Sequence, residues 1–85
     1  MLHYIHVTDI EWDTDGEKVN LPNSVLIIAN AEGYKMLYED ECGIADFLSD
    51  NYGWCIGQFD AGEYTKDNPE LNKVFANTKN VLIAY

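Results

Sequence analysis

Arginine is absent from this sequence. Its 85 residues include five lysines against fifteen aspartates and glutamates, which gives a formal net charge of −10 at pH 7. Arginine is the side chain best suited to bidentate contacts with phosphates and base edges, and a strongly negative chain is repelled by nucleic acids and by anionic membrane surfaces. We therefore expect no direct contact with DNA or RNA. A basic protein partner, a cation or simple solubility remains to explain the charge.

Cysteine and long apolar runs are scarce as well. Two cysteines, Cys42 and Cys55, are too few for the disulfide framework of a small secreted domain, and their spacing is not the CxxC pattern of a zinc site. Apolar runs such as VLIIA at 25–29 are far shorter than the ~20 residues that a membrane-spanning helix needs. The sequence therefore predicts a cytoplasmic protein with no membrane segment, no metal centre and no cofactor.

Motifs for catalysis are missing too. The stretch GWCIGQFDAG at 53–62 has neither the lysine nor the following helix of a phosphate-binding loop, and no cysteine–histidine–acid set is indicated by spacing. His3 and His6 lie three apart in an expected strand, so they point to opposite faces and cannot share a metal ion. Paired carboxylates act as acid and base only in a cleft that separates their pKa values. We predict that the protein is not an enzyme.

The residues that are present predict one α+β domain spanning 1–85, with a core at 3–60 and a C-terminal extension at 65–85. We expect a small antiparallel sheet, in which three strands form a meander and one or two further strands are added. The expected strands are residues 3–12, 25–29, 34–38, 54–60 and 81–85. Apolar residues change parity after Val7, which predicts a β-bulge near Thr8–Asp9. Turns are expected at DTDGE (13–17) and NAEG (30–33).

One main helix is expected to pack on this sheet. Its apolar residues recur at helical spacing, at Ile44, Phe47, Leu48 and Tyr52. Gly53 stands where a glycine commonly ends a helix, and Asp40 and Glu41 lie near the positive N-terminal end.

The tail after an expected loop at 61–68 has two interpretations. Asn68-Pro69-Glu70 can cap and begin a second short helix, with Leu71, Val74 and Phe75 on one face. Alternatively, residues 73–85 form a hairpin. In either case VLIAY is a strand. The residues assigned to the core are Ile5, Val7, Ile27, Ile44, Phe47, Leu48, Ile56 and Phe59.

Acidic side chains alternate along DIEWDTDGE at 9–17. They are Asp9, Glu11, Asp13, Asp15 and Glu17. Aligned as a calcium-binding EF-hand loop, the run puts Pro22 where a bidentate glutamate is required, and no helix precedes it. The simplest interpretation is a solvated turn between strands. The alternative is a carboxylate face presented to a basic partner.

A second acidic set lies on the main helix. Asp46 and Asp50 are four residues apart, so they share the face opposite the apolar stripe. Together with the run at 9–17 they are predicted to form a spaced array of negative charge that imitates the phosphates of a duplex. The apolar anchors expected nearby are Tyr34, Tyr38, Tyr52 and Trp54, and Trp12 is expected to contact the partner as well. The predicted partner-binding residues are Asp9, Glu11, Trp12, Asp13, Asp15, Glu17, Asp46 and Asp50.

Two stretches of the sequence resemble known proteins: VTDIEWDTDGEKVNLP at 7–22 and GIADFLSDNYGWCIGQFD at 43–60. They resemble a group of small, acidic, functionally uncharacterised proteins of gut-type bacteria and their phages. That group has the pattern VTxIxWDTDGExVxLP followed by IADxLSDxYGWC. The resemblance covers about residues 5–60 and implies a shared ββαβ-like core, without any activity or cofactor. NAEGYKMLY at 30–38 and the tail from Thr65 are additions to the shorter members. In size and charge alone the chain is also similar to inhibitors of host defence, such as anti-CRISPR proteins.

The sequence thus favours a non-enzymatic acidic protein-binding module. We expect a phage or mobile-element inhibitor that occupies a basic nucleic-acid-binding surface of a host protein. Two alternatives stay open. One is a small metal- or ligand-binding domain that uses the carboxylates of 9–17. The other is a self-associating structural protein, a homodimer for example, in which 81–85 or 34–38 is an edge strand that pairs with its twin.

Overall fold

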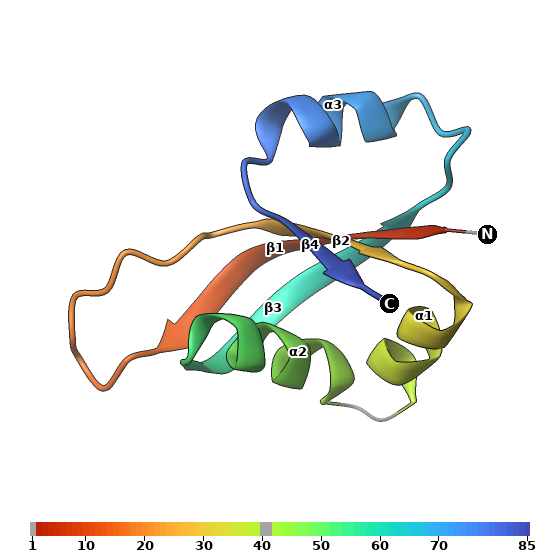
Figure 1. The fold of residues 1–85 in the computed structure, drawn as a ribbon. Helices are drawn as coiled ribbons and strands as arrows, with labels where there is room; N and C mark the ends of the chain where they lie inside the picture. Colours follow the sequence, from red (N-terminus) through yellow and green to blue (C-terminus); the bar gives the residue numbers. More distant parts are fainter. Residues whose placement is uncertain (1, 40–41) are drawn as a thin grey trace.

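Four strands form one mixed sheet in the computed structural model, which describes residues 2–39 and 42–85 (Figure 1). The strands are β1 (His3–Asp13), β2 (Val25–Ala29), β3 (Cys55–Tyr64) and β4 (Val81–Ala84), and the helices are α1 (Ala31–Tyr38), α2 (Gly43–Tyr52) and α3 (Glu70–Asn77). In the order β3-β1-β2-β4, β1 is antiparallel to both neighbours, whereas β4 runs parallel to β2. The predicted α+β class is confirmed.

Helices cover the two faces of this sheet unequally. α1 and α2 lie together below the sheet in Figure 1, and α3 lies above it. The lower face carries the main core, formed by Ile5, Val7, Ile10, Val25, Ile27, Ala29, Leu37, Ile44, Leu48 and Ala84. On the upper face, Leu71 and Val74 of α3 pack with Leu26. The C-terminal half of β1 has no helix above it (Figure 1).

Most of the predicted core is confirmed. Ile5, Val7, Ile27, Ile44 and Leu48 are buried. The other three predicted residues, Phe47, Ile56 and Phe59, are half-buried and pack against the same cluster. Ile56 and Phe59 lie on β3, an edge strand that is mostly exposed, which explains their incomplete burial.

The bulge predicted near Thr8–Asp9 is confirmed. Thr8 pairs with Asp60 and Glu11 with Gln58, so two residues of β1 lie opposite one residue of β3. Asp9 has a φ of 50°, a left-handed conformation that aspartate tolerates better than most residues. The extra residue returns Ile10 to the same core as Val7, although their separation is odd.

The predicted turn at 30–33 and strand at 34–38 are wrong, because residues 31–38 form helix α1. The Asn30 side chain caps this helix by accepting a 2.8 Å hydrogen bond from the Gly33 N–H. Gly33 lies directly against the Ala84 carbonyl of β4, and Leu37 is buried beneath the helix. The three-strand meander therefore does not form. Instead β3 pairs with the free side of β1.

The C-terminal tail forms a helix and not a hairpin. α3 follows Asn68, whose side chain accepts a 2.9 Å hydrogen bond from the Glu70 N–H. Leu71 and Val74 are buried as predicted, whereas Phe75 is 42 % exposed. Strand β3 extends to Tyr64, so part of the loop expected at 61–68 is strand.

The main predicted helix is confirmed as α2. It ends at Gly53, which has a φ of 80° and donates its N–H to the Ser49 carbonyl. The predicted positions of Asp40 and Glu41 lie outside the described residues. Among the described helices, none has both the length and the apolar character that crossing a membrane requires.

Candidate functional site

The acidic run forms a projection that we call the acidic arm, residues 9–17. It consists of the C-terminal part of β1 and the turn that follows, and it extends from the sheet at the left of Figure 1. All five of its carboxylate residues are exposed. The arm therefore concentrates formal negative charge at one end of a molecule that measures 40 × 28 × 17 Å.

A tight turn at 14–17 ends the arm. Asp15 and Gly16 have φ values of 52° and 83°, and the Glu17 N–H donates a 2.9 Å hydrogen bond to the Thr14 carbonyl. Two consecutive left-handed residues are typical of a type I′ turn. The Asp13 side chain accepts a 3.3 Å bond from the Asp15 N–H, and the Thr14 hydroxyl donates to the Glu17 carbonyl. These bonds order the turn and fix the carboxylate of Asp13.

Trp12 secures the arm to the body of the protein. Its indole Nε1–H donates a 2.8 Å hydrogen bond to the Pro22 carbonyl, across the loop. Its ring lies edge-on against Tyr52 of α2, with 5.4 Å between the centroids. Trp12 is half-buried, so its main structural role is to position the carboxylates. Its predicted contact with a partner stays a prediction.

The two predicted acidic sets do not lie on one face. Side chains alternate along β1, so Glu11 points to the face opposite Trp12, which packs on α2. On α2, Ile44 and Leu48 face the sheet, and Asp46 and Asp50 therefore face away from it. The carboxylates therefore form two rows, one on the acidic arm and one on the outer face of α2, on opposite sides of this end of the molecule.

Metal binding by the acidic arm finds no support in this geometry. Within residues 2–39 and 42–85, no three side chains of histidine, cysteine, aspartate or glutamate come close enough together to hold a metal ion.

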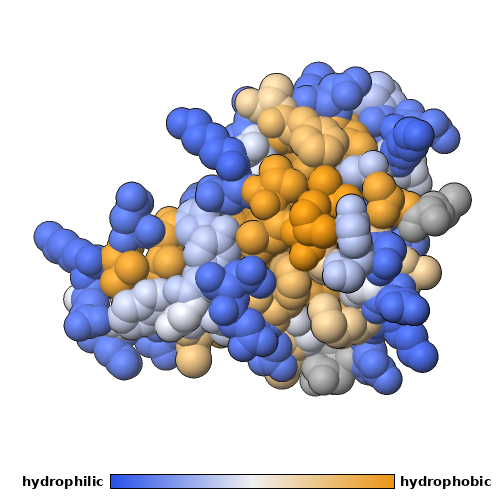
Figure 2. All heavy atoms as spheres, viewed as in Figure 1, coloured by the Kyte–Doolittle hydropathy of each residue, from blue (hydrophilic) through white to orange (hydrophobic). Residues whose placement is uncertain are grey.

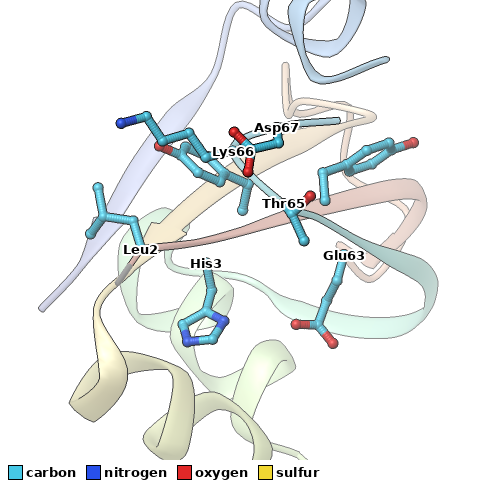
Figure 3. A pocket seen from close by; sticks show the side chains of 8 residues that line it. Leu2, His3, Glu63, Thr65, Lys66 and Asp67 are labelled. Carbon is cyan, nitrogen blue, oxygen red and sulfur yellow. The ribbon is translucent and has the colours of Figure 1, made fainter. Parts of the chain in front are cut away.

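A groove of about 650 Å³ lies where β1 begins and β3 ends (Figure 3). Tyr4 and Tyr64 face each other across the two strands, and the loop after β3 supplies Lys66 and Asp67. This volume is within the range of small-molecule pockets. Sequence reasoning missed the groove, because it depends on a strand pairing between residues that are far apart in the chain. Aromatic, acidic and basic groups line it, but none of the predicted site residues does.

Beside this groove lies an aromatic cluster, of which only His3 belongs to the lining. The His3 ring stacks on Tyr34 of α1 with 4.0 Å between centroids, and Tyr34 is tilted against Tyr38 at 4.7 Å. The Tyr34 hydroxyl donates a 3.1 Å hydrogen bond to Glu63. That bond, more than burial and the nearby negative charge, raises the pKa of Tyr34. Glu63 is thus already engaged within the protein.

His6 lies on the other face, as predicted from its separation from His3. Its Nε2 is 3.3 Å from the hydroxyl of Thr78, which is buried at the end of α3. Burial lowers the pKa of His6 below the ordinary 6.5, because a charged imidazole loses solvation there. The neutral ring therefore joins β1 to the C-terminal segment.

We expect this histidine to make the fold sensitive to mild acid. Between the lowered pKa and 6.5 the unfolded chain binds more protons at His6 than the folded chain, so the free energy of unfolding falls as the pH drops through this window and levels off above it. Thermal unfolding of wild type and His6→Gln at pH 5.5 and 7.5 (about one unit either side of the ordinary value) measures the effect. An equal pH dependence in both proteins would contradict this role.

Comparisons with other proteins add no constraint on function. No protein-family model, no curated protein and no solved structure matches the chain. The resemblance to small acidic proteins of bacteria and phages therefore stays a prediction, and the geometry of the chain carries the functional inference.

Proposed function

We propose that the protein is a non-enzymatic binding module whose acidic arm enters a basic, nucleic-acid-binding cleft of another protein. The observation that carries this proposal is the placement of exposed carboxylates on both sides of one end of the molecule, which is formed by the acidic arm and α2. Glu11 and Asp13 lie on one side, and Asp46 and Asp50 of α2 lie on the other.

Charge on two sides suits a cleft better than a flat surface. A duplex carries phosphates on both strands, so the walls of a cleft that binds it carry lysine and arginine on both sides. Two rows of carboxylates are complementary to such walls, and complementary charge steers association and selects the partner. The protein is also thin, with a shortest dimension of 17 Å.

Occupation of the cleft would exclude the nucleic acid that normally binds there. The proposed role is therefore that of a competitive inhibitor, and the size and charge of the chain are those of inhibitors that phages and mobile elements direct against host defence. The bond from Trp12 to the Pro22 carbonyl and the internal bonds of the turn support this role, because a pre-ordered arm loses little conformational entropy on binding.

Neutralising four of these carboxylates is expected to weaken binding at least ~10-fold at low salt. The test variant carries Asp13→Asn, Asp15→Asn, Asp46→Asn and Asp50→Asn. Asparagine keeps the side-chain oxygen that accepts from the Asp15 N–H and tolerates the left-handed conformation of residue 15. Immobilised protein captures partners from cell lysate, and duplex DNA is then used to release them. Affinities for a captured partner are measured with purified proteins.

A matched control separates the site from overall charge. Glu32→Gln, Glu39→Gln, Asp67→Asn and Glu70→Gln also remove four charges, so each variant moves from −10 to −6. These four residues are exposed and lie on or beside α1 and α3. The control is expected to lose less than ~3-fold in affinity. Equal losses in both variants, or captured proteins that duplex DNA does not release, would show that the acidic arm is not the binding site.

A further inference from the structure

β4 is an edge strand whose outer side is open. The sheet order places it next to β2 alone. The hydrogen bond from the Leu26 N–H to the Asn80 carbonyl shows which residues of β4 turn their backbone groups toward β2. Leu82 and Ala84 direct their N–H groups to β2, whereas Val81 and Ile83 direct N–H and C=O away from it. The outer side of β4 therefore presents backbone donors and acceptors.

The side chains at this edge are apolar and exposed. Val81 is 41 % exposed, Ile83 52 % and Tyr85 70 %. Met36 of α1, also exposed, lies beside Ile83 and Tyr85. Figure 2 shows the result as an apolar patch over β4, bordered by hydrophilic residues. Patches of this kind on a small protein usually mark a contact surface.

Acidic side chains are missing from the same part of the chain. Residues 71–85 contain Lys73 and Lys79 but none of the fifteen acids. The other edge strand, β3, differs: it carries Asp60 and Glu63 and has an irregular register. Charged side chains and bulges are two of the means by which an edge strand avoids pairing with another. β4 has neither means.

We propose that β4 pairs antiparallel with β4 of a second copy of this chain, so that the two sheets join into one. A two-fold axis beside Leu82 places Val81 of each copy opposite Ile83 of the other, and each such pair exchanges two N–H···O bonds. Val81 and Ile83 also meet as an apolar cross-strand pair. The dimer leaves both acidic arms free, because each arm extends from β1 and β2 lies between β1 and β4.

Charge selects a second copy over other occupants. Two molecules with a net charge of −10 repel each other, and an isologous contact brings identical patches together. A patch poor in carboxylates suits such a contact best, and residues 71–85 form the longest stretch of the sequence without an acidic side chain. The antiparallel arrangement also brings Lys79 of one copy to the end of β4 where Glu32 of the other lies.

Sedimentation equilibrium tests this inference. Between about 10 µM and about 1 mM protein, the average mass is expected to rise from 9.7 kDa towards twice that value. Raising the salt from ~50 to ~500 mM is expected to strengthen the dimer, since it screens the repulsion between copies. This direction is opposite to that expected for docking of the acidic arm. A mass that stays at 9.7 kDa up to ~1 mM would overturn the proposal.

Two further measurements identify the surface. Ile83→Lys or Val81→Lys, which put a charge at the centre of the pairing, are expected to raise the dissociation constant at least ~10-fold. Val19→Lys is the matched control, because Val19 is 37 % exposed in the loop after the acidic arm. Amide exchange at Val81 and Ile83 is expected to slow as concentration rises, whereas Leu82 and Ala84 are protected throughout. A dimer that neither lysine variant weakens, or that leaves these two amides unprotected, would contradict the proposed pairing.

Discussion

Gly33→Ala is expected to lower the free energy of unfolding by about 3 kcal/mol. An added Cβ at residue 33 would overlap the Ala84 carbonyl oxygen and lie 2.7 Å from its carbonyl carbon. Both atoms belong to the backbone of β4, so neither can rotate away. In a helix where nothing obstructs the added Cβ, the same substitution would raise the free energy of unfolding by about 1 kcal/mol, because alanine is the better helix former. The sign of the effect therefore reports the contact between α1 and β4.

Chemical denaturation measures this change, with Gly62→Ala as the control. Gly62 lies on β3, and nothing is within 4 Å of the position of its added Cβ. We expect the control to be neutral or slightly stabilising, because alanine restricts the unfolded chain. A stable Gly33→Ala protein would mean that α1 does not pack on β4 as described.

Leu48→Ala is expected to cost a similar amount, about 3 kcal/mol, with a fall in melting temperature of roughly 15 °C. Leu48 is 0 % exposed and belongs to the core between α2 and the sheet. Truncation removes buried apolar surface and leaves a cavity that rigid strands on one side cannot close. Because α2 also supports Trp12 through Tyr52, the acidic arm should loosen as well.

Thermal and denaturant unfolding measure this effect, and Leu2→Ala is the matched control. Leu2 loses the same atoms on truncation but is 41 % exposed, so the expected loss is below about 1 kcal/mol. Equal losses at the two positions would show that α2 is not packed on the sheet.

Local sequence patterns predicted most of the secondary-structure elements correctly. β1 with its bulge, β2, β3 and α2 all follow from alternation, helical spacing and the glycine at residue 53. Helix α1 did not follow, because YKMLY is a short, mostly apolar segment that suits a strand as well as a helix. Its stability depends on the cap at Asn30 and on the approach of Gly33 to Ala84. The second contact joins residues about fifty positions apart, and no local pattern shows it.

The candidate site was predicted in composition but not in arrangement. The carboxylates of the acidic arm are exposed as expected for a solvated turn. The division of the carboxylates into two rows depends on the bulge at Asp9 and on the way α2 packs against Trp12. The apolar edge at β4 was visible as VLIAY, a strand that could pair with its twin. The sequence did not show that β4 pairs in parallel with β2, which leaves the backbone N–H and C=O groups of Val81 and Ile83 open.

The salt dependence of partner binding tests the central claim most directly, namely that the protein acts through the charge on its surface. With a partner captured by the acidic arm, affinity should fall at least ~10-fold between ~50 and ~500 mM salt, and the logarithm of the affinity should decrease linearly with that of the salt concentration. The variant neutralised at Asp13, Asp15, Asp46 and Asp50 should show a shallower slope. An affinity that is the same at both salt concentrations, with equal slopes for the two proteins, would contradict the account.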